Sequence, residues 1–121
     1  MIRLLIRAPG RFKKSFGYSW DGLKAVFVKE ESFRLESVAL VVVLVLLAAS
    51  SWPIWKKLAL IAAYLLVPLA EIFNSAIEDI CDGITHDRRP FIKAAKDKGA
   101  LAVLMAIVIN ALTLVALAAC G

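Results

Sequence analysis

Three long runs of apolar residues are separated by short charged segments along this chain. Ser37 to Trp52 and Gly99 to Gly121 contain no charged residue, and Leu58 to Ile77 is interrupted only by Glu71. The runs are continuous rather than alternating, and about 20 apolar helical residues cross the hydrocarbon core of a bilayer. A membrane β-barrel is excluded, because three strands cannot close their edges. The three predicted transmembrane helices cover about residues 34–52, 56–81 and 96–119.

The first 30 residues show a different pattern, in which apolar residues recur at helical spacing beside basic ones. The apolar positions are Leu5, Phe12, Phe16, Trp20, Leu23 and Phe27, and the basic flank is Arg3, Arg7, Lys14 and Lys24. This arrangement predicts an amphipathic helix on the membrane surface, with a break at Pro9-Gly10. No apolar h-region with a small-residue cleavage site follows, so a cleavable signal peptide is not expected. A plain interfacial anchor is the alternative to a functional surface helix.

Composition indicates an integral membrane protein with a single domain over residues 1–121. The chain is 61% hydrophobic, and its mean hydropathy of +0.79 exceeds what a soluble globular domain tolerates. The predicted fold is therefore all-α, with an N-terminal amphipathic surface helix and three transmembrane helices. We do not expect three helices of one chain to hide Glu71, Asn74 and Asn110 from lipid on every side, and this predicts a homotrimeric bundle.

The net charge of +5 comes from basic residues that cluster beside the apolar runs. By the positive-inside rule, the N-terminus and the loop between the second and third spans lie in the cytoplasm, and the C-terminus lies outside. This clustering favours membrane topology and lipid head groups over nucleic acid as the reason for the charge. Cys81 and Cys120 fall at opposite faces of the membrane, so no disulfide is expected between them.

Two connections join the predicted spans. Trp52-Pro53 marks the outer turn, where Lys56 and Lys57 are expected to extend toward water. The inner loop, from Asp82 to Gly99, is short and highly charged. It contains the only histidine of the chain, His86, which we expect to be a solvated side chain rather than a ligand.

Polar residues interrupt the second span at helical spacing. Glu71, Asn74, Ser75 and Glu78 follow one another at i, i+3, i+4 and i+7, so they share one helix face. Glu71 lies 13 residues past Leu58, about 20 Å into the membrane at 1.5 Å per residue. An ionisable residue at such a depth costs several kcal/mol unless it is buried and partnered, which makes Glu71 a functional candidate. The alternative is a protonated glutamate that only bonds a neighbouring helix.

Matching polar residues occur at the inner ends of the other two spans. They are Glu30, Glu31, Arg34 and Glu36 before the first span, and Lys96 and Asp97 before the third. Glu30 and Glu78 supply carboxylate oxygens, which suit Mg²⁺. Glu71 could act as a general base that accepts the proton of a lipid hydroxyl, and Lys96 could neutralise phosphate charge. The residues alone indicate an intramembrane polar site that faces the cytoplasm: a phosphoryl-transfer site, or the acidic site of a small proton-coupled transporter. No soluble-kinase signature is present.

Four motifs resemble the prokaryotic diacylglycerol kinase family of small three-span trimeric lipid kinases. They are "GYSWDGL" at Gly17 to Leu23, "EESFRLE" at Glu30 to Glu36, "EIFNSAIE" at Glu71 to Glu78 and "AKDKGALAVL" at Ala95 to Leu104. The resemblance implies transfer of the γ-phosphate of MgATP to 1,2-diacylglycerol, which gives phosphatidic acid at the inner leaflet of the bacterial inner membrane. It implies ATP as co-substrate, Mg²⁺ or another divalent cation, a homotrimer, a cytoplasmic N-terminus and a periplasmic C-terminus.

The same resemblance implies roles for individual residues. Glu71 corresponds to the catalytic base with Asn74 beside it, Glu30 and Glu78 to the metal-binding carboxylates, and Lys96 and Asp97 to catalytic residues that contact the nucleotide. The remaining ATP-binding positions are Arg11, Tyr18, Glu30, Glu78, Asp87, Arg88 and Arg89. The lipid-side positions are Arg11, Ser15, Phe16, Gly17, Tyr18, Ser19, Trp20, Lys24, Ala25, Val26, Phe27, Glu31, Ser32, Phe33, Arg34, Leu35, Glu71 and Ala100.

Undecaprenol is the alternative lipid acceptor, because the resemblance also fits an undecaprenol kinase built on the same scaffold. "GYSWDGL", "FRLE" and the serine of "NSAIE" favour diacylglycerol. A non-enzymatic transporter is the least favoured interpretation.

Overall fold

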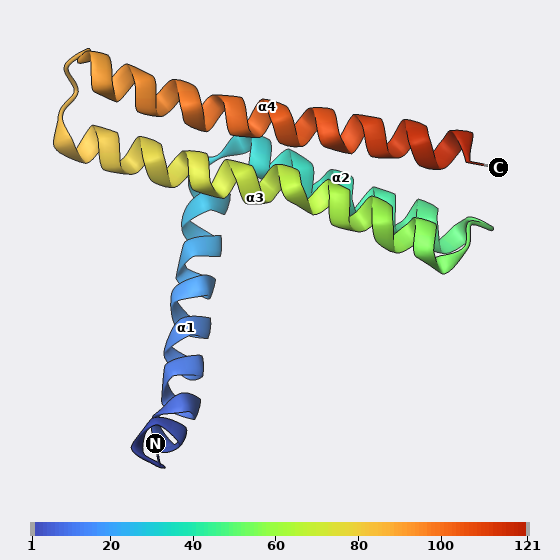
Figure 1. Ribbon diagram of the computed structural model, residues 1–121, viewed down its shortest axis with the longest axis horizontal. Coiled ribbons are helices and arrows are strands. Elements are labelled where there is room, and N and C mark those ends of the chain that lie inside the picture. Colours follow the sequence, from blue (N-terminus) through green and yellow to red (C-terminus); the bar gives the residue numbers. More distant parts are fainter. Residues whose placement is uncertain (1, 121) are drawn as a thin grey trace. The chain divides into compact units, whose positions relative to one another are not determined.

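The computed structural model of the protein describes the backbone of residues 2–120 and the side chains of residues 10–120. These residues form four α-helices and no strand (Figure 1). The helices are α1 (Ile2–Lys29), α2 (Glu31–Ala49), α3 (Ile54–Ile84) and α4 (Pro90–Ala119). By length and composition, α2, α3 and α4 can each cross a membrane. The predicted all-α fold with three spans is therefore confirmed.

The chain divides into two compact units, one ending at Glu31 and the other beginning at Ser32. The first unit consists of α1, which is one continuous helix through Pro9 and Gly10. The predicted break at this pair is wrong. A proline removes one backbone hydrogen-bond donor from a helix. The leucine, isoleucine, arginine and lysine residues on both sides are adequate helix formers, and the helical conformation continues across the pair.

In the second unit, α3 is the element that positions the others. It packs along α4, and the two helices run in opposite directions (Figure 1). With 31 residues, α3 is about 46 Å long at 1.5 Å per residue, longer than the hydrocarbon core of about 30 Å. The predicted inner loop from Asp82 to Gly99 is wrong in extent, because only residues 85–89 lie outside helices. Apolar content sets how much of a helix the membrane covers, whereas its polar end can continue into water.

At the outer end, one leucine from each helix forms a small core: Leu47, Leu60 and Leu117. Lys56 lies beside this core and is 6% exposed, so the prediction that it extends toward water is wrong. Its Nζ donates to the backbone oxygens of Leu117, at 3.0 Å, and of Cys120. The last carbonyls of a helix lack intrahelical donors and carry partial negative charge, which explains why the ammonium group turns inward.

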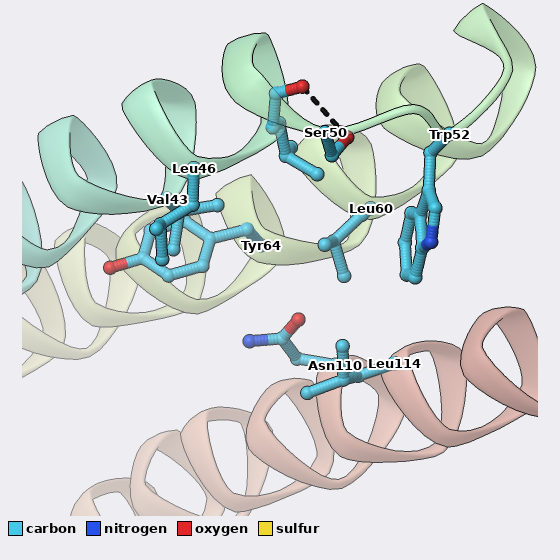
Figure 2. A pocket seen from close by; sticks show the side chains of 9 residues that line it. Val43, Leu46, Ser50, Trp52, Leu60, Tyr64, Asn110 and Leu114 are labelled. Atoms are coloured by element: carbon cyan, nitrogen blue, oxygen red, sulfur yellow. Dashed lines mark hydrogen bonds between the residues drawn. The ribbon is translucent and has the colours of Figure 1, made fainter.

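A cavity of about 390 Å³ lies between α2, α3 and α4 next to this core. Figure 2 shows Tyr64 of α3 and Asn110 of α4 among its apolar lining side chains. Asn110 is half-buried there. The lining residues are Val43, Leu46, Leu47, Ser50, Trp52, Leu60, Tyr64, Asn110 and Leu114.

Candidate functional site

The polar face of α3 begins at Glu71, 17 residues and about 25 Å from the start of the helix at Ile54. Ser75 is buried, and Glu71, Asn74 and Glu78 are partly buried. The side-chain Nδ2 of Asn74 donates to Oε1 of Glu78 at 3.4 Å. Glu71 Oε2 and Asn74 Oδ1 are buried and find no hydrogen-bond donor. Helices of one chain therefore cover these two atoms, while Glu71 and Asn74 as whole residues stay partly exposed.

Gly99 of α4 is what allows Asn74 to be covered. The Asn74 amide lies directly over the glycine, so that a Cβ atom added to Gly99 would overlap with Oδ1 and lie 3.3 Å from Cγ. The same Cβ would be 3.4 Å from Cδ1 of Ile77. Any larger residue at position 99 would have to push α4 away from α3 or turn the amide. In the sequence, Gly99 marks only the end of the predicted inner loop. Its close approach to Asn74 depends on the packing of α4 against α3.

A carboxyl group from α2 completes this part of the site. The Glu36 and Glu71 carboxyl groups are within hydrogen-bond distance of each other. Oε2 of Glu36, like that of Glu71, is buried without a donor. The hydroxyl of Tyr64 donates to the backbone oxygen of Glu36 at 2.7 Å, which ties α2 to α3 just above the pair. The sequence places Glu36 among the polar residues at the inner ends of the spans but assigns it no role. The available signal was its position directly before an uncharged run of 16 residues, Ser37 to Trp52.

The inner ends of α3 and α4 enclose a charged hollow of about 690 Å³. Lys96 Nζ lies 2.9 Å from Asp82 Oδ1, and Lys93 Nζ lies 2.6 Å from Asp97 Oδ2. Lys96 and Asp97 therefore line the same hollow but bond to different partners. The hollow is lined by Asp82, Thr85, His86, Asp87, Arg88, Arg89, Pro90, Ile92, Lys93, Lys96 and Asp97. It brings together Asp87, Arg88 and Arg89 with the lysine and aspartate that the resemblance assigns to the nucleotide.

The remaining predicted residues lie on α1 and on the first turns of α2. Those on α1 are Arg11, Ser15, Phe16, Gly17, Tyr18, Ser19, Trp20, Lys24, Ala25, Val26 and Phe27, and all are exposed except Val26. Lys24 Nζ lies 5.5 Å from the centre of the Trp20 ring. Glu30 falls between the two helices, where its N–H donates to the oxygen of Val26 at 2.9 Å. The residues on α2 are Glu31, Ser32, Phe33, Arg34 and Leu35.

Phe33 and Ala100 differ in burial from the residues next to them. Phe33 is 6% exposed, whereas Leu35 is exposed. Ala100 is exposed on α4 directly after the buried Gly99. Within residues 10–120, no three histidine, cysteine, aspartate or glutamate side chains are grouped closely enough to hold a metal ion by themselves.

Known proteins resemble this chain over most of its length. The model of the family described as prokaryotic diacylglycerol kinase matches residues 17–118. A diacylglycerol kinase of Escherichia coli (strain K12) is 38% identical over 103 residues, which are 85% of this chain and 84% of the relative. One of Pseudomonas aeruginosa is 36% identical over 106 residues, with the same shares. One of Haemophilus influenzae is 33% identical over 92 residues, 76% of this chain and 78% of the relative.

Proposed function

Because this chain belongs to the prokaryotic diacylglycerol kinase family, we propose that it transfers the γ-phosphate of ATP to the hydroxyl group of 1,2-diacylglycerol. The product is phosphatidic acid, formed at the inner leaflet of the bacterial inner membrane. The observation that carries the proposal is the partly buried carboxyl group of Glu71, whose Oε2 atom is buried one turn from Asn74 on a helix that can span a membrane. A carboxylate within a membrane span is energetically costly, so its presence there indicates a function. A lipid hydroxyl can approach it from the membrane.

Glu71 acts as the general base. It accepts the proton of the lipid hydroxyl while the hydroxyl oxygen attacks the γ-phosphorus, and ADP leaves with the bridging oxygen. General bases contribute on the order of 10²–10⁴ in rate, and the rest of phosphoryl transfer depends on positioning and charge neutralisation. Asn74 lies one turn away and holds its amide against Gly99 and Glu78, which keeps this face of α3 rigid.

The charged hollow binds the nucleotide phosphates. Arg88, Arg89 and Lys96 supply cationic donors for phosphate oxygens. Asp82 pairs with Lys96, and Asp97 pairs with Lys93. A hollow of about 690 Å³ is within the usual range for small-molecule sites. His86 lines the hollow as an exposed side chain and has no assigned role.

Mg²⁺ accompanies the nucleotide, with Glu30 and Glu78 as its protein ligands. Glu78 fits this ion, because its partly buried carboxylate is a hard oxygen ligand of the kind that Mg²⁺ prefers. When bound, the ion screens the charge of the triphosphate. Mg²⁺ is usually held by one or two carboxylates, with water and substrate phosphates as the other ligands.

The lipid enters against α1, whose apolar and basic residues suit the membrane interface. A homotrimer brings the spans of neighbouring chains together. The N-terminus and the charged hollow face the cytoplasm, where ATP is available, and the C-terminus faces the periplasm.

Incubation of the purified protein with γ-³²P-labelled ATP, Mg²⁺ and mixed micelles tests this function, with diacylglycerol and undecaprenol offered separately. The expected result is label in phosphatidic acid, with Glu71→Gln protein as the control for contaminating kinases. Label in undecaprenyl phosphate alone would reassign the acceptor within the family. The absence of label from both lipids would overturn the lipid kinase function itself.

A further inference from the structure

Glu36 carries a partly buried carboxyl group that the mechanism above does not use. It comes from α2, one residue before the uncharged run, and its side chain meets that of Glu71 on α3. Both Oε2 atoms are buried and find no donor. Neither carboxyl group forms an ion pair with a cationic side chain among residues 10–120. Two carboxylates in contact with each other therefore lack any compensation for a second negative charge.

Chemistry restricts how such a pair is occupied. Like charges in contact at a partly buried site repel each other and disfavour ionisation of both groups, so the pair holds one proton. That proton supplies the donor that both Oε2 atoms lack, because a carboxylic acid donates to a carboxylate in a short, charge-assisted hydrogen bond. The residues of α3 and α4 that follow add no further charge beside the two glutamates. Tyr64 of α3 donates its hydroxyl proton to the Glu36 backbone, and α4 has no titratable residue between Gly99 and Ala119.

We propose that Glu36 is the positioning residue for the catalytic base: its protonated carboxyl group donates a hydrogen bond to Glu71 and holds that group as an oriented carboxylate. The inference rests on the proposed lipid kinase function. The pair carries one proton before the chemical step. It carries two after Glu71 has taken the proton of the lipid hydroxyl, and that second proton is then released to water. The carboxyl group of Glu36 keeps its own proton throughout and never touches the substrate.

The geometry also explains why the donor comes from a separate helix. Tyr64 ties the backbone of α2 to α3 at Glu36 itself, so the carboxyl group is delivered at a set height along α3. A rotation of Glu71 toward lipid or toward the hollow would break the shared hydrogen bond. The base is therefore kept in one orientation even though lipid and nucleotide approach it from different sides.

Two substitutions of Glu36 separate hydrogen bonding from charge. Glu36→Gln keeps a donor of the same length, and we expect its kcat to stay within about threefold of the original enzyme. Glu36→Leu removes the donor at similar volume, and we expect its kcat to fall by about tenfold or more while KM for both substrates changes less than twofold. Ser37→Ala is the matched control. Ser37 follows Glu36 directly on α2, and its Oγ donates to the backbone oxygen of Phe33 in the same helix, at 2.8 Å. Melting temperatures of all variants show that each is folded.

The outcomes separate this inference from the function on which it rests. If the unaltered enzyme labels neither lipid, the proposed function fails. If it labels lipid but Glu36→Leu keeps its kcat, or if the Gln and Leu variants lose the same activity, the positioning role is overturned while the function stands.

Infrared spectroscopy in an ester-free detergent tests the shared proton without turnover. We expect a carbonyl band of a protonated carboxylic acid in the unaltered protein. The band should disappear in Glu36→Gln, because the remaining Glu71 carboxyl group then has no like charge beside it and ionises. A band that disappears only in Glu71→Gln would place the proton on the other carboxyl group and overturn the assignment.

Discussion

The side-chain amide of Asn74 lies directly over Gly99, so closely that no Cβ atom fits at position 99. The polar face of α3 at Asn74 can therefore pack this closely on α4 because Gly99 has no side chain. Gly99→Ala should move Asn74 and lower activity by about tenfold or more, because small misplacements of positioning groups are costly in rate. Gly83→Ala is the control, since nothing lies within 4 Å of a Cβ added there. Equal activities of the two variants in the ³²P assay would show that the close approach has no catalytic consequence.

Glu71→Gln should separate catalysis from folding. The amide keeps the shape of the side chain but cannot accept the hydroxyl proton, so we expect kcat to fall by about 10² or more, with little change in either KM. A neutral amide is no harder to bury than a carboxylate, so the melting temperature should not fall. Normal turnover with a lower melting temperature would instead assign Glu71 a purely structural role.

Metal dependence should change when either proposed ligand is altered. Glu78→Gln and Glu30→Gln each remove one negatively charged oxygen from the ion, so the Mg²⁺ concentration for half-maximal activity should rise. The measurement is a Mg²⁺ titration at a fixed ATP concentration. Asp79→Asn is a suitable control, because Asp79 follows Glu78 on α3 and is exposed. Unchanged titrations for both glutamate variants would place the ion elsewhere.

Nucleotide binding should depend on the arginines of the charged hollow. Arg88→Ala and Arg89→Ala each remove a phosphate donor, and we expect KM for ATP to rise by about tenfold, which corresponds to about 1.4 kcal/mol of binding free energy. KM for the lipid should stay the same. Lys57→Ala is the control, since Lys57 lies near the start of α3, far along the helix from the hollow. Steady-state kinetics in which the lipid KM alone changes would contradict this assignment.

Stability should depend on Lys56 at the opposite end of α3. Its ammonium group bonds to the last carbonyls of α4 and lies 5.4 Å and 5.7 Å from the ring centres of Trp52 and Trp55. Lys56→Met keeps the apolar stem but loses these bonds. The free energy of unfolding should fall by about 1.5–3 kcal/mol, the usual value for hydrogen bonds to a charged group. Lys57→Met should have no such effect. Equal melting temperatures of the two variants would contradict the role of Lys56 in joining the helices.

The sequence by itself determined the features of this protein that depend on local spacing. Three continuous apolar runs are enough to predict three helices, since the bilayer demands a length and a composition that can be counted. The stripe from Glu71 to Glu78 is also local, because residues three, four and seven apart share a helix face wherever the helix is placed. The motifs around these residues carried the resemblance to the kinase family, which the comparisons with known proteins confirm.

Only the tertiary structure decided which groups meet across helices. Glu36 and Glu71 are 35 positions apart, and Asn74 and Gly99 are 25 apart, so no periodicity connects them. Lys96 bonds to Asp82 on α3, 14 positions before it, and no spacing in the sequence predicts this pair. Lys56 turns toward α4 because unpaired carbonyls lie within its reach. Such contacts depend on the relative placement of helices, which follows from packing over their whole length and not from any short segment.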